Sequence, residues 1–182
     1  FAVAPTSDGG ALLVGSTKSF GGHVDAWLVK TSENGDVQWS NTYGGGGHDA
    51  AHAVTVTDDS IAVVAETYNY GPGTPTNHNM MLFRTDPSGK PLWDKTFGGQ
   101  PEGDAGFRIE ALGQGGKTTG YLIGGATESF ALGKDDVWLM RLSADGDHKW
   151  SKAIGGPGDD ELRGLAHTPD GGFIVTGFTR SF

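Results

Sequence analysis

Short apolar runs and turn residues alternate along the whole chain. The first run, Ala11 to Val14, follows the turn signal Ser7-Asp8-Gly9-Gly10 and precedes Gly15-Ser16-Thr17. A run of that length between turn signals predicts a β-strand, and its lack of polar residues predicts burial on both faces of a sheet. Together with the residues before the turn, it forms a predicted β-hairpin within residues 1–20.

This pattern returns three more times. A threonine closes each apolar run, and a small residue stands two positions before that threonine. The four pairs are Gly15 and Thr17, Ala65 and Thr67, Gly125 and Thr127, and Gly177 and Thr179. A small side chain kept at one strand position is expected where backbones lie close together.

A second predicted hairpin alternates with the first. Its copies cover residues 25–45, 79–99 and 136–156. In each copy a glycine stands four residues before a tryptophan: Gly35 and Trp39, Gly89 and Trp93, Gly146 and Trp150. The tryptophans are 54 and 57 residues apart. A period of that size, built from short strands, is typical of a repeat protein whose units stack.

We name the first hairpin of a repeat AB and the second CD, after their four strands. Four short strands in each repeat predict the blade of a β-propeller, an all-β fold of four-stranded antiparallel sheets around an axis. The predicted units are blade 1 (1–46), blade 2 (47–99), blade 3 (100–156) and a half blade of A and B strands only (157–182). About three and a half blades are therefore present.

The glycine and the tryptophan have distinct predicted roles in blade docking. The glycine supplies the positive φ of the C–D turn. The indole lies in the gap between neighbouring blades, where an aromatic side chain buries about 150–250 Å². These Gly-x-x-x-Trp segments resemble the tryptophan-docking turns of quinoprotein-type propellers. The whole repeat resembles the propeller repeats of secreted and cell-surface proteins of bacteria and archaea, and this resemblance implies an extracellular or cell-surface location.

The blade count leaves the last unit incomplete. Three blades and one AB hairpin do not close a ring of four to eight blades. The last AB hairpin lacks a CD partner, and an open strand edge favours pairing with another chain. Two interpretations follow: the sequence is a fragment of a longer propeller, or self-assembly with further copies completes the blade, for example in a filament.

Composition narrows the class of function. The 32 glycines and the hydrophobic share of 36% fit many short strands joined by turns. A net charge of −9 argues against nucleic acid or an anionic membrane as partner, since both need basic clusters. The absence of cysteine excludes disulfides, cysteine zinc sites and thiol catalysis. No apolar run approaches the roughly 18 residues of a membrane helix, so membrane insertion is not expected.

Acidic residues recur in the loops that lead from one repeat to the next. Those that follow a Gly-Gly pair are Asp49, Asp104 and Asp160, and an Asp or Asn also begins each C strand, at positions 25, 79 and 136. Repeated oxygen ligands on glycine-rich loops are candidates for calcium binding. The alternative, which we favour, is that these carboxylates accept hydrogen bonds from loop amides. No other cofactor or metal is expected.

Three further patterns contain residue types that can carry chemistry. Lys30, Arg84 and Arg141 close the C strands, which predicts a repeated salt bridge or exposed edge charges. His48 and His52 lie at a junction of loop and strand, where a spacing of four does not place them on one face. Residues 111–118 fit a relaxed phosphate-loop pattern but lead into a strand instead of a helix, so nucleotide binding is not expected.

Interchangeable blades predict a non-catalytic structural or binding scaffold whose partners are proteins, either further copies of itself or the rest of a longer chain. The alternative is a fragment of a propeller enzyme, such as a quinone-dependent dehydrogenase or a glycan-cleaving enzyme. An enzyme should carry, in one blade, polar residues that its siblings lack. The private features are the 71–78 loop and the 113–119 turn, and neither brings an acid–base pair. Catalytic residues are therefore not assigned.

Overall fold

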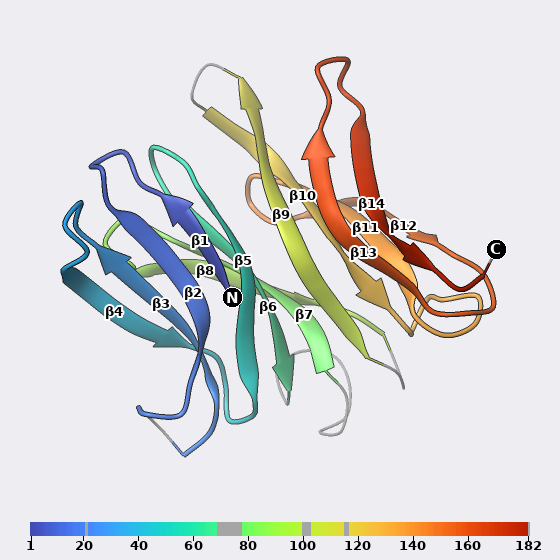
Figure 1. Ribbon diagram of the computed structural model, residues 1–182, viewed down its shortest axis with the longest axis horizontal. Helices are drawn as coiled ribbons and strands as arrows, with labels where there is room; N and C mark the ends of the chain where they lie inside the picture. The colour runs from blue at the N-terminus through green and yellow to red at the C-terminus, as the bar shows by residue number, and fades with distance from the viewer. Residues whose placement is uncertain (21, 69–77, 100–102, 115–116, 182) are drawn as a thin grey trace.

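The computed structural model describes residues 1–20, 22–68, 78–99, 103–114 and 117–181. All fourteen elements within these ranges are β-strands, arranged in three sheets of four strands and one of two. Figure 1 shows the four sheets side by side in chain order. Among the described residues, no helix is long and apolar enough to cross a membrane.

Each sheet consists of consecutive, antiparallel strands. The first sheet contains β1 (Ala2–Pro5), β2 (Ala11–Thr17), β3 (Asp25–Thr31) and β4 (Val37–Tyr43). The second contains β5 (Asp49–Val56), β6 (Ile61–Tyr68), β7 (His78–Thr85) and β8 (Pro91–Phe97). The third contains β9 (Asp104–Gln114), β10 (Lys117–Thr127), β11 (Asp136–Ser143) and β12 (His148–Ile154). The last contains β13 (Asp160–His167) and β14 (Phe173–Thr179).

The predicted all-β class is confirmed, as are the antiparallel four-stranded sheets. Three complete sheets and one two-stranded sheet are consistent with the predicted blades and half blade. Closure of these sheets around a propeller axis stays a prediction.

The sheets pack face to face through two hydrophobic cores. One core joins the first and second sheets and contains Leu28 and Val63, while the other joins the second and third sheets and contains Val64 and Met140. Val63 and Val64 are neighbours on β6, so their side chains point to opposite faces of one sheet. This two-sided burial explains why β6 carries almost no polar residues. The sequence predicted the same burial for Ala11 to Val14, and that prediction is wrong for Leu13, whose side chain is 42% exposed.

The A strands lie next to one another along the inner side of the array, with contacts from β1 to β5, from β5 to β9 and from β9 to β13. A bulge in three of these strands leaves one residue without a partner on the B strand: His52, Phe107 and Arg163. Phe1 holds the same place relative to β2, because Ala2 pairs with Val14 as Ala53 pairs with Val64. The inner strands therefore present one non-paired side chain per repeat.

Candidate functional site

Tryptophans of one sheet lie on glycines of the next. A Cβ atom added to Gly89 would stand 3.0 Å from Cζ3 of Trp39, and one added to Gly146 would stand 2.9 Å from Cη2 of Trp93. Both glycines have positive φ, 84° and 77°. Each therefore meets two requirements that only glycine satisfies without strain: a left-handed turn and close approach of a ring.

Polar contacts accompany each tryptophan–glycine dock. The Tyr43 hydroxyl donates a 2.6 Å hydrogen bond to the carbonyl oxygen of Gly89. The Lys95 ammonium lies 2.7 Å from a carboxylate oxygen of Asp147, next to the second dock. These polar contacts fix the position at which each D strand meets the C–D turn of the next sheet. Burial of apolar surface alone would not fix that position, because it has no direction.

The two outermost members of this series have no dock. Trp150 lies on β12 and precedes a sheet that contains only β13 and β14, so the described residues offer it no C–D turn. Gly35 has the positive φ of its counterparts, 84°, yet no atom lies within 4 Å of its Cβ position. Within the part of the chain that the structure describes, Trp150 therefore has no glycine turn against it, and the Gly35 turn has no tryptophan against it.

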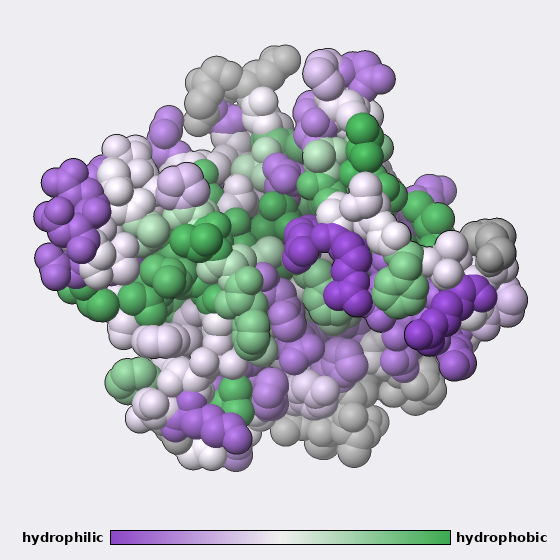
Figure 2. All heavy atoms as spheres, in the orientation of Figure 1, coloured by the Kyte–Doolittle hydropathy of each residue, from purple (hydrophilic) through white to green (hydrophobic). Residues whose placement is uncertain are grey.

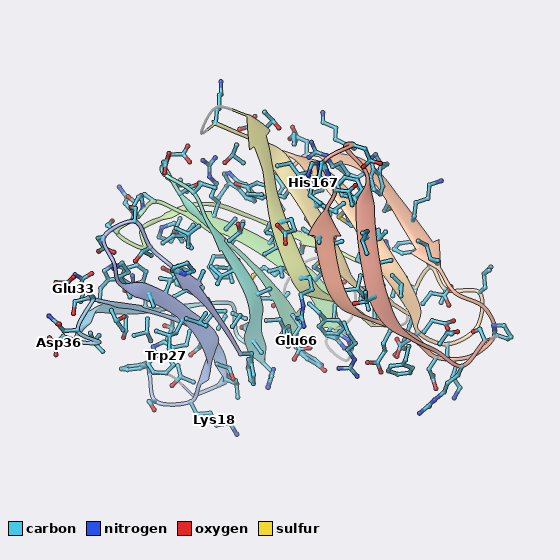
Figure 3. All side chains as sticks on the ribbon, turned by 45° about the horizontal axis from the view of Figure 1, so that its top comes forward. Lys18, Trp27, Glu33, Asp36, Glu66 and His167 are labelled. Carbon is cyan, nitrogen blue, oxygen red and sulfur yellow. The ribbon has the colours of Figure 1, made fainter. Side chains whose placement is uncertain are left out.

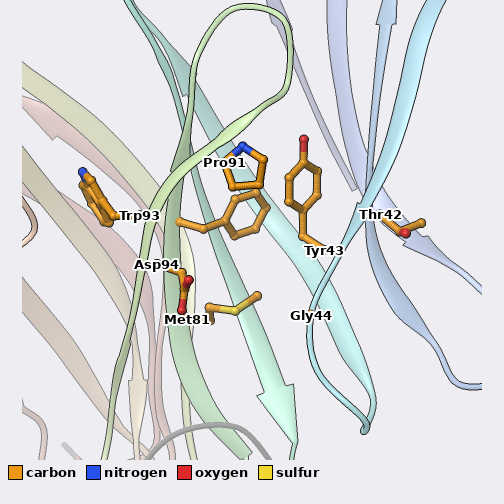
Figure 4. Close-up of a pocket in the computed structure, with 8 residues that line it drawn as sticks. Thr42, Tyr43, Gly44, Met81, Pro91, Trp93 and Asp94 are labelled. Atoms are coloured by element: carbon orange, nitrogen blue, oxygen red, sulfur yellow. The ribbon is translucent and has the colours of Figure 1, made fainter.

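A small cavity lies beside the first dock, between β4 and β8 (Figure 4). Its volume is about 270 Å³, and Tyr43 and Phe83 stack at its wall with ring centroids 4.6 Å apart. The other lining residues are Thr42, Gly44, Met81, Pro91, Trp93 and Asp94. With one carboxylate among mostly apolar walls, the cavity suits an apolar side chain better than a reaction centre.

The basic residues that end the C strands pair with the A–B turns. Lys30 Nζ lies 2.8 Å from Asp8 Oδ2, and Arg84 Nη2 lies 3.0 Å from Asp59 Oδ2. Arg141 instead donates to the carbonyl oxygens of Tyr121 and Leu142. The repeated salt bridge predicted from the sequence is thus present in two of the three complete sheets.

The aspartates of the loops between repeats act as caps. Asp49, Asp104 and Asp160 each accept a hydrogen bond from a loop glycine amide, over 3.0, 2.8 and 2.9 Å. Two of them also accept a serine hydroxyl, from Ser129 to Asp104 and from Ser181 to Asp160. Within the described ranges, no group of three or more His, Asp or Glu side chains is placed to hold a metal ion. These contacts are those of the favoured capping role, and calcium binding stays a prediction.

The second sheet carries a polar cluster that the sequence analysis did not predict. His52 Nε2 lies 3.4 Å from Glu66 Oε2, within ion-pair distance but without hydrogen-bond geometry, and His48 Nδ1 lies 3.9 Å from Glu66 Oε1. Glu66 is near the middle of the molecule in Figure 3. Contact with His52 lowers the pKa of Glu66 against the opposing effect of burial, and the charges of His52, His78 and His48 act in the same direction as the contact. The two histidines therefore converge on one carboxylate, so the expectation that their spacing separates them is wrong.

This cluster is private to one repeat. The residues at the position of Glu66 in the other repeats are Ser16, Ala126 and Phe178, and those at the position of His52 are Phe1, Phe107 and Arg163. Comparing the repeats column by column would have marked Glu66 as the one acid among apolar and small residues. The bulge that turns the His52 side chain toward Glu66 leaves no comparable signal in the sequence. Of the 71–78 loop and the 113–119 turn, which the sequence marks as private to one repeat, residues 71–77 and 115–116 lie outside the described residues.

The bulge residues also line a cavity of about 200 Å³ on the inner side of the array. The rings of Phe1 and Phe107 flank His52 at 5.9 and 5.4 Å between centroids. The remaining lining residues are Arg108, Glu161, Leu162 and Arg163. Arg163 is already paired with Glu161 at 2.6 Å, so its charge is partly neutralised within the cavity.

No model of a known protein family matches the chain, and no curated protein matches it.

Replacement of Trp93 by alanine should lower the free energy of unfolding by about 3 kcal/mol, because it empties a dock between two sheets. Trp150→Ala is the matched control and should cost about 1 kcal/mol or less, since that indole meets no glycine turn. Urea unfolding followed by fluorescence measures both. Equal losses for the two variants would show that docking contributes nothing specific.

Gly89→Ala should destabilise the chain more than Gly35→Ala. Both substitutions place alanine at a positive φ, which costs roughly 1–2 kcal/mol. Only Gly89 adds a clash, with Asn41 Nδ2 at 2.5 Å and the Trp39 ring at 3.0 Å from the new Cβ, for which we expect about 1–3 kcal/mol more. Thermal unfolding of the pair measures the difference, and a difference near zero would contradict the contact.

The Glu66 carboxylate should make stability fall in acid. Its pKa is lowered from the ordinary value of 4.5, so its stabilising contribution is complete above that pH and is lost as the pH falls through the lower folded value. Glu66→Gln should therefore flatten the loss of unfolding free energy below pH 4.5, measured by urea unfolding at several pH values. Glu33→Gln, on an exposed turn, is the control and should keep the parent's slope. A parent-like slope in Glu66→Gln would exclude the contact with His52.

Proposed function

We propose that this chain is an array of propeller blades with a non-catalytic structural and binding role, located outside the cell or at the cell surface. Its partner is protein: further copies of itself or further sequence of the same repeat. The observation that carries the proposal is the series of docks, in which Trp39 and Trp93 lie on glycine turns of the next sheet, while the described residues place no C–D turn on Trp150 and no third strand beside β14.

The surface at the open end supports a binding role. Side chains exposed on β14 include Ile174, 57% exposed, and Phe178, 38% exposed. Figure 2 shows hydrophobic side chains at the surface on the upper right, where β12 and β14 lie, and over the first sheet on the left. A strand edge with apolar neighbours and no cover is the surface to which another strand adds.

The location is supported by the resemblance of the repeats to those of secreted and cell-surface proteins. The net charge of −9 agrees with a partner other than nucleic acid.

One observation favours the enzyme alternative, namely the private cluster of Glu66 with His52 and His48. A carboxylate and an imidazole in contact are the groups used in general acid–base catalysis. The tryptophan–glycine docks argue more strongly for a scaffold, because they occur between successive sheets, whereas the Glu66 cluster belongs to one repeat. The Glu66→Gln variant removes the carboxylate while keeping the shape of the side chain. It should abolish the activity of an enzyme that uses this carboxylate and should leave a scaffold role unchanged.

Self-association should be visible by light scattering as the protein concentration rises, with an average mass above that of one chain. Ile174→Lys should shift the association to higher concentration by at least about tenfold, because a charge on an edge strand blocks pairing. Leu132→Lys makes the same change at a loop residue that is 82% exposed, and should leave association unchanged. A folded protein with the mass of one chain at every concentration would refute self-assembly.

A further inference from the structure

A cavity of about 480 Å³ lies where the loops of the first and second sheets meet. Three segments form it: the loop from β2 to β3, the loop from β4 to β5, and the end of β6. Its walls carry Lys18, His23, His48 and Tyr68, and glycines form most of the remainder. Figure 3 shows Lys18 at the loop end of the first sheet.

Backbone hydrogen bonds hold the three segments together. The Asp49 amide donates to the carbonyl oxygen of Val24 over 2.7 Å, and the Tyr68 amide donates to the carbonyl oxygen of His48 over 2.9 Å. The rings of His48 and Tyr68 meet edge to face, with 5.6 Å between their centroids. The cavity is therefore held by contacts between the two sheets and by contacts within its own wall.

The cavity gathers basic side chains in a chain whose net charge is −9. Lys18, His23 and His48 are exposed, and no Asp or Glu of the described residues lines the cavity. The ion pairs among the described residues include neither Lys18 nor His23. His48 approaches one carboxylate, with 3.9 Å between its Nδ1 and Glu66 Oε1. The cavity therefore has basic groups available to a ligand.

The same framework recurs between the third and last sheets. There the Asp160 amide donates to the carbonyl oxygen of Asp135 over 2.7 Å, and the Arg180 amide donates to that of Asp159 over 3.0 Å. These two hydrogen bonds match those of the first cavity, so the residues of the two places can be compared position by position.

The comparison shows a reversal of charge. The positions of Lys18, Val24 and His48 are held by Glu128, Asp135 and Asp159. Burial, together with the charges of Asp159 and Glu161, raises the pKa of Asp135. The fold therefore accepts acids where the first cavity has bases, and the basic residues are a property of that cavity and not a requirement of the repeat.

The basic residues near the acidic counterpart are neutralised. Arg180 Nη1 lies 2.8 Å from Asp159 Oδ2, and Lys134 Nζ lies 3.7 Å from Asp159 Oδ1. Lys134 precedes Asp135 as His23 precedes Val24, so it is the positional equivalent of His23. It supplies a matched control for the basic cavity.

The donors of the basic cavity suit a tetrahedral oxyanion. A lysine ammonium binds phosphate as a compact point charge, and imidazole and phenol groups add hydrogen-bond donors. A planar carboxylate is typically held by the fork of an arginine, and no arginine of the described residues lines this cavity. At Gly22 and Gly46 no atom lies within 4 Å of the Cβ position, so these parts of the wall are open.

Size and charge limit the ligand to a small one. A cavity of about 480 Å³ is in the range that holds a small molecule. A long polyanion would also meet the negative field of the rest of the chain, which disfavours its approach. A single phosphate or sulfate group reaches the basic residues without extending over the acidic surface.

We propose that this cavity binds a phosphate or sulfate group, either as the free ion or on a small molecule. Lys18 supplies a fixed positive charge, and His23, His48 and Tyr68 supply hydrogen-bond donors from the other segments. This site is additional to the proposed protein partner, because it lies within residues 18–68 and uses neither the tryptophan–glycine docks nor β14.

The test is a titration of the ¹⁵N-labelled chain with inorganic phosphate and, separately, with inorganic sulfate, at an ionic strength held constant with sodium chloride. Resonances of His23 and His48 should shift and saturate with at least one of the two ions. Glucose 6-phosphate, with glucose as its neutral control, separates the two sources. Tighter binding of the ester than of inorganic phosphate would assign the site to a small molecule, and weaker binding would assign it to the free ion.

Variants of Lys18 should grade the affinity by charge. Lys18→Arg should bind nearly as the parent does, Lys18→Gln should bind at least about threefold more weakly, and Lys18→Glu at least about tenfold more weakly. Lys18 is exposed, so these variants should unfold at the parent's urea concentration. Lys134→Gln removes the same charge from the acidic counterpart and should leave the affinity unchanged.

Three results would overturn the proposal. One is the absence of saturable shifts at His23 and His48 with both ions. Another is equal weakening by Lys18→Gln and Lys134→Gln, which would show a general effect of net charge. The third is binding of acetate as tight as that of phosphate and sulfate, which would show that the cavity does not select a tetrahedral oxyanion.

Discussion

The contact on which this structure depends is the seating of an indole on a glycine of the next sheet. Burial of apolar surface drives the sheets together but has no direction, so stacked sheets could slide over one another. A flat ring over a backbone without a Cβ atom permits one position only, and the hydrogen bond from Tyr43 to Gly89 marks that position further. Strand geometry sends Val63 and Val64 to the two cores, and the docks set how the sheets on either side meet those faces.

Sheets that are apolar on both faces need a cover on both. The second sheet is covered on both faces by its neighbours, and its B strand is buried from Ile61 to Ala65. The outer sheets do not, and Leu13 on β2 and Ile174 on β14 are 42% and 57% exposed, at positions whose counterparts in the second sheet are buried. The same property that stacks the repeats therefore leaves apolar side chains exposed on the outer sheets of the described residues, and this exposure supports the proposed binding role.

The repeated features of the fold were predictable from the sequence, since turns, apolar runs and the Gly-x-x-x-Trp spacing are local and occur several times. The strands around Trp39, Trp93 and Trp150 lie where that pattern placed them. The cluster of Glu66 and His52 was not predictable in the same way. It requires a bulge that leaves His52 out of the ladder, and a bulge depends on how two strands pair and not on the composition of either. Capping by Asp104 was predictable in part. The residue type indicated a cap, but only the fold shows that the Gly99 amide is the group that donates to it.

The positions that recur between repeats are separate in the fold from the positions that vary. Docking uses the outer strands and the C–D turns, where Gly89 and Gly146 cannot change without strain or a clash. The bulge position on the A strands does not contact the C–D turns. His52 holds it in one repeat, Arg163 in another, and phenylalanine in the others. A substitution there alters the charge and shape of the inner surface while leaving the stacking contacts intact. Chemistry specific to one repeat is therefore expected at the bulges, and the Glu66–His52 pair is located at one of them.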